Sequence, residues 1–257
     1  MNHSIFSIIA LMLCLSGCTI SGKHSAAKSV PIHPSGGDAD LVNVPEQKTN
    51  DPWQNLNRTT FGFNDELNTY ALRPVAHGYA AIVPIRVRTG VSNFFDNLNY
   101  PVRFINSVLQ GKITRSAQET GKFVVNSTAG VGGLIRVSDR ISSLADIPAE
   151  DFGQTLGVWG IAPGPYIVLP VLGPSDCRDL VGFAGDFVMS PLNWHTIGII
   201  HYAFITDPLT IALSTTRFVN GLPKAVESYD QMKSEAVDPY IAMRNAYLSY
   251  RADQVKK

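Results

Sequence analysis

Apolar residues recur at helical spacing along most of the chain after residue 50. In each of these segments the apolar positions follow one another every three or four residues, which places them on one face of an α-helix. A proline or glycine follows the first four stripes, and both residue types end helices readily. The stripes that predict helices are Trp53, Leu56, Thr60, Phe63, Leu67 and Tyr70, ending before Pro74; Val91, Phe94, Phe95 and Leu98, ending at Pro101; Val102, Ile105, Val108 and Leu109, ending at Gly111; Ile113, Ala117, Val124 and Val125, ending at Gly130–Gly133; and Tyr240, Met243, Tyr247 and Tyr250.

Asp-Pro pairs mark the positions where helices are expected to begin. An Asp side chain accepts hydrogen bonds from the free N–H groups of a first helical turn, and a proline at the first helical position has no N–H to leave unpaired. Gln54 follows Asp51 at the spacing of a capping box. The predicted helix starts are Asp51-Pro52, Asp207-Pro208 and Asp238-Pro239.

Charged residues almost disappear between Phe152 and Thr216. They make up 16% of the whole chain, but these 65 residues hold only five. Prolines and glycines interrupt the segment, which predicts two short strands at Leu156–Ile161 and Tyr166–Val171. A helix at Trp194–Thr206 is too short to span a bilayer. Two interpretations remain open at this point: the well-buried core of a water-soluble domain, or a body that lies within one leaflet of a membrane.

The first eighteen residues have the pattern of a bacterial lipoprotein signal. Ile5–Leu15 is an apolar run of eleven residues, which is the length of a signal-peptide core. Leu15-Ser16-Gly17-Cys18 resembles a lipobox, in which cleavage leaves a lipidated cysteine; the alternative is a plain secretory signal with a chance cysteine. Thr19 favours sorting to the outer membrane. We therefore expect a signal peptide at residues 1–17, a lipidated N-terminus and flexible linker at 18–50, and the folded body at 51–257.

The composition and motifs argue against several classes of function. With 21 basic and 21 acidic residues the formal net charge is zero, which excludes a strongly basic nucleic-acid binder. No nucleophile elbow, zinc-binding motif or paired-cysteine motif occurs, so we expect no catalytic residue, no metal and no cofactor apart from a lipid on Cys18. Cys177 is predicted to be a small apolar residue, and Arg178 and Asp179 to form a structural ion pair. Gly130–Gly133 lacks the Lys-Ser/Thr of a phosphate loop and is predicted to be a hinge or a tight helix contact.

Many of these residues together resemble the MlaA (VacJ) family of outer-membrane lipoproteins. The resemblance extends from about Asp51 to Tyr250 and includes the lipobox. Its most specific part is Phe152-Gly153-Gln154-Thr155-Leu156-Gly157, followed in order by Trp159-Gly160, Gly164-Pro165-Tyr166 and Arg178-Asp179; Asn57-Arg58, Phe63-Asn64 and Asp238-Pro239-Tyr240 also fit.

The resemblance implies a mainly α fold, a ring-like arrangement of amphipathic helices lying in the periplasmic leaflet, with a short β-hairpin and an amphipathic pore. It also implies transport of mislocalised outer-membrane phospholipid to a soluble periplasmic carrier of the MlaC type, in association with a trimeric porin and without enzymatic activity. The family's gating hairpin would lie at Leu156–Val171, and a second segment would control opening. The implied residues are Leu156, Trp159, Tyr166, Ile167 and Leu169 in the hairpin, and Phe61, Gly62 and Phe63 in the second segment.

Two other functions remain as alternatives at the level of sequence. One is a structural envelope lipoprotein that braces a porin without moving lipid. The other is a phospholipid-degrading enzyme, which would need a nucleophile–base pair or a calcium-binding carboxylate cluster that the sequence does not reveal. Transfer of phospholipid to a purified carrier separates the first alternative from transport, and release of lysolipid would identify the second.

Overall fold

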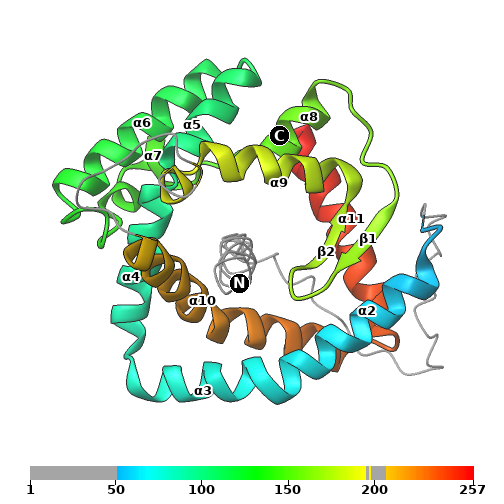
Figure 1. Ribbon diagram of the computed structural model, residues 1–257. Coiled ribbons are helices and arrows are strands. Elements are labelled where there is room, and N and C mark those ends of the chain that lie inside the picture. Colours follow the sequence, from blue (N-terminus) through cyan, green and yellow to red (C-terminus); the bar gives the residue numbers. More distant parts are fainter. Residues whose placement is uncertain (1–50, 195–196, 198–206) are drawn as a thin grey trace, which may run out of the picture.

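The structure is a computed structural model that describes residues 51–194, 197 and 207–257. Figure 1 shows helices joined end to end around a ring, with a short hairpin on the inner side of α11. This arrangement confirms the predicted mainly helical ring with one hairpin. The elements are α2 (Gln54–Leu67), α3 (Arg73–Ile82), α4 (Ile85–Leu98), α5 (Tyr100–Leu109), α6 (Ile113–Thr128), α7 (Ser142–Ala145), α8 (Phe152–Val158), β1 (Tyr166–Leu169), β2 (Gly173–Asp176), α9 (Cys177–Met189), α10 (Asp207–Glu235) and α11 (Pro239–Lys256).

The helices predicted from the middle stripes are present as α4, α5 and α6. Pro101 separates α4 from α5 and occupies the first turn of α5, where its missing N–H leaves no intrahelical bond unmade. Gly111 ends α5 with a backbone φ of +73°. Gly133 lies in the turn after α6, and a Cβ there would come within 2.6 Å of the Asn97 Cβ on α4. The glycine cluster is therefore a tight helix contact.

The first helical segment does not end before Pro74, and that prediction is wrong. α2 passes into a π-helical turn at Asn68–Leu72, and α3 begins directly after it with Pro74 in its first turn. In the wider turn the Arg73 N–H donates to the Asn68 carbonyl, five residues back. This shift lets the helix accommodate a residue that has no N–H, so the chain stays helical to Ile82.

Helix capping follows the Asp-Pro prediction at only one of the two sites that the structure describes. Asp238 caps α11 and accepts a hydrogen bond from the Ile241 N–H at 3.2 Å. Asp51 does not cap α2; its carboxylate instead accepts hydrogen bonds from the side chains of Asn57 at 2.9 Å and Arg244 at 3.1 Å. The side chain of Asp207 and most of the helix predicted at Trp194–Thr206 lie outside the described residues.

The predicted strand at Leu156–Ile161 is also wrong, because Phe152–Val158 forms helix α8. Its glycines serve helix packing: a Cβ on Gly182 of α9 would lie 2.4 Å from the backbone nitrogen of Gly153. α8 and α9 thus touch backbone to backbone, which only glycine at these positions allows. Asp151 caps α8 by accepting from the Gln154 N–H at 2.8 Å.

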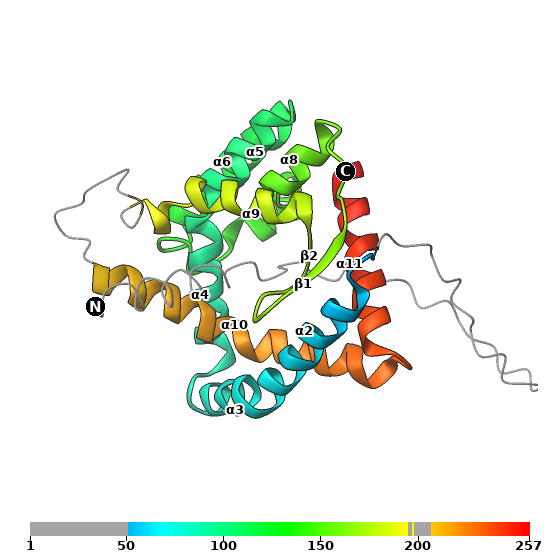
Figure 2. The same ribbon diagram turned by 45° about the vertical axis from the view of Figure 1, so that its right-hand side comes forward.

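Few apolar side chains are buried between the elements of the ring. α10 packs along α3 in both views, through a cluster of Ala76, Leu222 and Val226 (Figures 1 and 2). Most other buried side chains among the described residues are polar or charged, and large apolar side chains such as Tyr70 (80% exposed) and Ile82 (82% exposed) lie on the surface. No helix in the described parts of the chain is long and apolar enough to cross a bilayer. The fold therefore has a polar interior and a surface rich in apolar groups.

The glycine contact between α8 and α9 predicts a large loss of stability in Gly182→Ala. The added methyl group cannot be accommodated without separating the two helices, so we expect a loss of about 2 kcal/mol or more. Gly78→Ala in α3 is the matched control, because nothing lies within 4 Å of its Cβ position. We expect that variant to gain up to about 1 kcal/mol from helix propensity. Denaturant unfolding in detergent, followed by far-UV circular dichroism, measures both; equal stabilities would contradict the contact.

Candidate functional site

The hairpin β1–β2 is the element that projects from the ring toward its middle (Figure 1). The strands are antiparallel, with Tyr166 opposite Asp176 and Leu169 opposite Gly173. Tyr166 and Val168 are buried in a cluster with Tyr240 of α11. The Tyr166 ring meets the Tyr240 ring at 6.3 Å between centroids. This aromatic contact fixes one face of the hairpin against α11.

Two asparagines of α2 bind the backbone of β1 and of the turn that follows it. The Asn57 side chain donates to the Tyr166 carbonyl at 3.0 Å and accepts from the Val168 N–H at 2.9 Å. Asn64 donates to the Leu169 carbonyl at 2.9 Å and accepts from the Val171 N–H at 2.8 Å. An amide side chain carries the same donor and acceptor as a peptide group, so each asparagine satisfies an edge that would otherwise be unpaired.

The two asparagines lie on the same face of α2, because seven helical residues make almost two full turns. Asn57 binds groups on either side of Ile167 in β1, and Asn64 binds groups on either side of Pro170 in the turn that follows β1. The sequence signal for these paired contacts is the interval between Asn57 and Asn64.

The tip of the hairpin holds a strained residue. Val171 has a φ of +68°, a region that β-branched side chains rarely occupy. Its N–H is the group that Asn64 accepts from. Strain at a loop tip that a single side chain holds in place is a recognised feature of functional segments.

Of the five residues that were predicted to lie in the hairpin, three lie there and two do not. Tyr166, Ile167 and Leu169 lie in β1, where Ile167 and Leu169 are half-buried and alternate with the residues that face α11. Leu156 and Trp159 do not belong to the hairpin, because α8 replaces its expected first strand. Leu156 is buried in α8, and Trp159 is exposed at its end, where its indole N–H donates to the Leu109 carbonyl at 3.1 Å.

The segment expected to control opening lies on α2, between the two asparagines. Phe61 is half-buried and packs on Tyr240 at 5.9 Å between ring centroids. Gly62 is exposed with nothing within 4 Å of its Cβ position, and Phe63 is 52% exposed. The fold thus brings this segment and the hairpin together, although about 100 residues separate them in the sequence. The gating roles of both stay predictions.

A largely buried network of ion pairs connects helices near the hairpin. Arg251 of α11 donates to both oxygens of Asp151, at 2.7 and 3.0 Å, and to Asp179 at 2.8 Å. Arg178 lies 3.3 Å from the same Asp179 carboxylate, so the residues expected to pair are part of a larger network. Burial alone would lower the pKa of Arg251, but its bonds to the two carboxylates raise it. These contacts join α8, α9 and α11.

Asp186 belongs to α9, and its side chain lies beside the first residue of α8. It accepts two hydrogen bonds. Its Oδ1 accepts from the Phe152 N–H and from the Asn106 side chain, both at 3.0 Å. Burial, reinforced by the nearby Asp151 carboxylate, raises the pKa of Asp186 to about 8. This environment cannot be predicted from the sequence, because the residues that bond to Asp186 come from α5 and α8.

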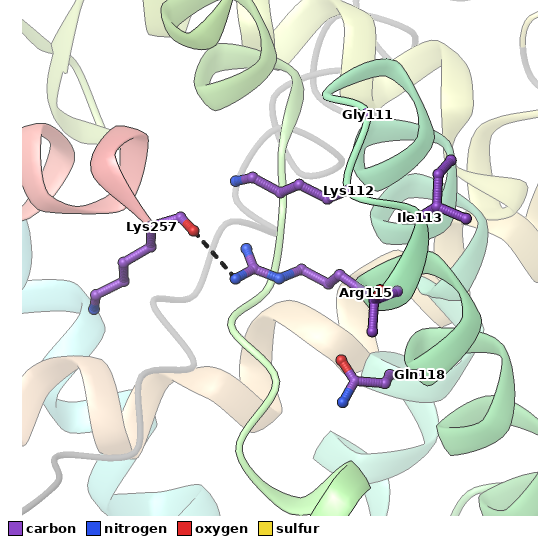
Figure 3. Close-up of a pocket in the computed structure, with 7 residues that line it drawn as sticks. Gly111, Lys112, Ile113, Arg115, Gln118 and Lys257 are labelled. Carbon is purple, nitrogen blue, oxygen red and sulfur yellow. Dashed lines mark hydrogen bonds between the residues drawn. The ribbon is translucent and has the colours of Figure 1, made fainter.

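A pocket of about 320 Å³ lies where α6 begins (Figure 3). Lys112 and Arg115 form one wall, and Arg115 donates to the Lys257 carbonyl at 3.3 Å. Both cations also bind the buried Glu150 carboxylate, with Lys112 at 3.0 Å. The single Glu150 carboxylate offsets only one of the two positive charges, and its bonds to both cations tie the start of α6 to the segment before α8.

The described residues hold no group of three or more His, Cys, Asp or Glu side chains arranged for a metal ion. Cys177 is a free thiol at the start of α9 and is half-buried. Cys18, the expected lipidation site, lies outside the described residues, so its modification stays a prediction.

The protein is a thin ring of helices whose buried side chains are mostly polar, whose surface is rich in apolar side chains and whose hairpin points inward. These features are those of a membrane-associated helical protein. The family model for the MlaA lipoprotein matches residues 49–254, and the chain belongs to that family. An uncharacterized protein of Rickettsia typhi is 34% identical over 76% of this chain and 74% of its own length. The intermembrane phospholipid transport system lipoprotein MlaA of Escherichia coli K12 is 32% identical over 79% of this chain and 77% of its own. A solved structure that concerns the structural basis for maintenance of bacterial outer membrane lipid asymmetry superimposes with a TM-score of 0.65 at 31% identity, covering 80% of this chain and 98% of that one.

The raised pKa of Asp186 predicts a pH dependence of stability. The folded pKa of about 8 lies above the ordinary value of 3.8, so the native state keeps a proton that the unfolded state has lost. The stability contributed by this group therefore falls as the pH rises from about 4 to about 8. Asp186→Asn keeps an oxygen acceptor without the charge and should gain on the wild type over that range, by at most about 1.4 kcal/mol per pH unit.

Unfolding midpoints of the wild type and Asp186→Asn at pH 5, 6.5 and 8 measure this difference. Asp253→Asn is the control, because Asp253 is exposed on α11. A constant difference between Asp186→Asn and the wild type at all three pH values would refute the assignment.

Proposed function

We propose that this protein removes mislocalised phospholipid from the outer leaflet of the outer membrane and passes it to a soluble periplasmic carrier of the MlaC type. It would lie in the periplasmic leaflet, held by a lipid on Cys18 and associated with a trimeric porin, and would maintain lipid asymmetry without catalysis. The names of the relatives and of the structural neighbour support the lipid, the transport and the membrane.

The observation that carries the proposal is the inverted distribution of polarity in the ring. Exposed apolar side chains on α2, α3, α4 and the π-helical turn, such as Phe63, Tyr70, Ile82 and Val87, would be unfavourable in water but favourable beside acyl chains. A phospholipid headgroup, in contrast, needs polar partners wherever it leaves water. A ring whose exposed apolar side chains suit acyl chains and whose buried groups are mostly polar has partners for both parts of such an amphipathic molecule.

The hairpin is the part of the site best placed to control passage of the lipid. Tyr166 and Val168 face α11, so the alternating Ile167 and Leu169 lie on the opposite face of the hairpin, which itself projects toward the middle of the ring (Figure 1). These two half-buried apolar side chains would meet the passing lipid. Replacing them changes that surface without touching the contacts to α11.

Transfer of labelled phospholipid tests the proposed function. The lipidated chain, reconstituted with its porin in outer-membrane vesicles, is mixed with purified carrier, and lipid on the carrier is measured over time. We expect transfer that depends on this protein. No transfer above vesicles lacking the protein would support a porin brace instead, and accumulation of lysolipid would indicate a degrading enzyme.

Ile167→Asn and Leu169→Asn should change the transfer rate at least severalfold, because each places an amide where the lipid would pass. Protein level and melting temperature should stay close to those of the wild type, since neither side chain belongs to the buried cluster with Tyr240. Val237→Asn is the matched control, because Val237 is fully exposed between α10 and α11. If all three variants transferred lipid at the wild-type rate, the hairpin surface would have no part in the path.

A further inference from the structure

We propose that the pocket at the start of α6 binds the headgroup phosphate of an anionic phospholipid, with Lys112 and Arg115 as its cationic partners. The inference goes beyond the proposed function, because this lipid would be held at the edge of the ring and would not be the transported molecule. It rests on that proposal only for the position of the protein in a membrane. Figures 1 and 2 show α5 and α6 at the periphery of the ring, away from the hairpin.

The pocket carries a surplus of positive charge. The side chains of Lys112 and Arg115 form its wall, and only 21% and 18% of their surfaces are exposed. None of the described residues that line the pocket is acidic, and the Glu150 carboxylate offsets one of the two charges. Lys257 contacts Arg115 through its carbonyl at 3.3 Å and carries a cation of its own, so it does not remove the surplus. Burial and repulsion from Arg115 lower the pKa of Lys112, as expected for two cations that are short of negative charge.

The two cations are already held in place for an anion. Glu150 is 2% exposed, and one of its oxygens accepts from both Lys112 and Arg115. Its other oxygen accepts from the Gln110 side chain at 2.9 Å, so the carboxylate itself is fixed. Figure 3 shows both cationic side chains extending in the same direction from the start of α6. A ligand therefore does not have to order two long side chains, which lowers the entropic cost of binding.

Exposed apolar side chains adjoin the pocket. Ile113 lines it and is 64% exposed, and Leu109, at the end of α5, is 38% exposed. Trp159 is 53% exposed, and its indole N–H donates to the Leu109 carbonyl at 3.1 Å. An exposed tryptophan beside apolar and cationic side chains is typical of the boundary between lipid headgroups and acyl chains. The surroundings of the pocket therefore suit acyl chains as well as an anion.

An anionic phospholipid is the occupant that uses both features. Its phosphate carries the negative charge that the pocket lacks, and its acyl chains would lie against Ile113, Leu109 and Trp159. A free phosphate ion would use the cations but would leave the apolar side chains in water. Phosphatidylglycerol has the net negative charge that the surplus favours, whereas phosphatidylcholine has no net charge.

Quenching of Trp159 by brominated phospholipids measures which lipid lies beside the pocket. The chain has three tryptophans, so Trp53→Phe and Trp194→Phe leave Trp159 as the only one. This reporter, made as the lipidated full chain, is placed in phosphatidylcholine vesicles that contain phosphatidylglycerol. Either lipid carries bromine near the headgroup end of its acyl chain. The two quenching curves give the binding of phosphatidylglycerol relative to phosphatidylcholine at this position.

We expect phosphatidylglycerol to bind beside Trp159 about fivefold more strongly than phosphatidylcholine, the increase that one uncompensated cation gives near an anionic lipid. Lys112→Gln and Arg115→Gln, made separately in the reporter, should each abolish most of this preference, because one carboxylate then faces one cation. Circular dichroism checks that both variants keep their helical content. Lys256→Gln is the matched control and should keep the preference, because Lys256 is an exposed cation at the end of α11 that does not line the pocket. The whole chain has no formal net charge, so a general attraction to anionic lipid does not produce this pattern.

Three results would overturn the site. The first is equal binding of the two lipids in the reporter itself, a result that does not depend on the folding of any charge variant. The second is an equal loss of preference in Lys256→Gln. The third is a loss on adding inorganic phosphate that exceeds the loss caused by sodium chloride of the same ionic strength, which would identify free phosphate as the preferred occupant.

The same measurements separate this inference from the proposed function. No quenching by either lipid would place Trp159 outside the bilayer and would reject both the site and the membrane position. Equal quenching by both lipids would reject the site alone. The assay contains neither porin nor carrier, so a failure of lipid transfer would reject the proposed function and would leave the measured preference as it stands.

Discussion

A thin ring of helices has very little interior, and this constraint decides which interactions hold the chain together. A helix in a ring has neighbours on few sides, so most of its surface meets the surroundings. The apolar clusters of α3 with α10 and of the hairpin with α11 are small. Cohesion must therefore come in large part from directional contacts, and each of these has to be satisfied because buried polar groups without partners are costly.

The buried contacts have this character throughout the ring. Arg251 joins three helices through two carboxylates, Glu150 gathers cations at the start of α6, and Asn220 of α10 donates to the Arg88 carbonyl of α4 at 3.0 Å. Between α8 and α9 there is no room for a side chain, and glycines allow the two backbones to come into contact. Such contacts fix geometry more narrowly than apolar packing does. They also leave the apolar side chains free to face a lipid environment.

The sequence predicted most helices of the ring and the first strand of the hairpin well, but not the structure at residues 156–161 or before Pro74. α4, α5, α6 and α11 follow from apolar stripes and from proline, because those signals are local. The prediction of a strand at Leu156–Ile161 is wrong, because the glycines that allow α8 to contact α9 are also typical of the residues that bound a strand. The π-turn before α3 was missed because Pro74 normally predicts a break.

The candidate site was recognised in its parts but not in its connections. Ile167 and Leu169 were placed on a strand correctly, and Phe61 was noted on α2, yet nothing linked the two segments. The second strand, Gly173–Asp176, has poor strand propensity and is specified by the turn before it. The asparagine pair was visible as two motif residues, but its meaning depends on a strand about 100 residues away. Contacts between distant polar groups are the information that a single sequence conceals.

The central claim is that the exposed apolar residues of the ring face acyl chains. Nitroxide labels at Tyr70, Ile82 and Val87, each placed singly in the lipidated chain with Cys177 replaced by Ala, test it in phospholipid vesicles, with Glu227 as the exposed polar control. Collisions with oxygen report a lipid environment, and collisions with a water-soluble nickel chelate report an aqueous one. The account predicts high oxygen and low nickel accessibility at the three apolar positions and the reverse at Glu227. High nickel accessibility at all four positions would contradict it.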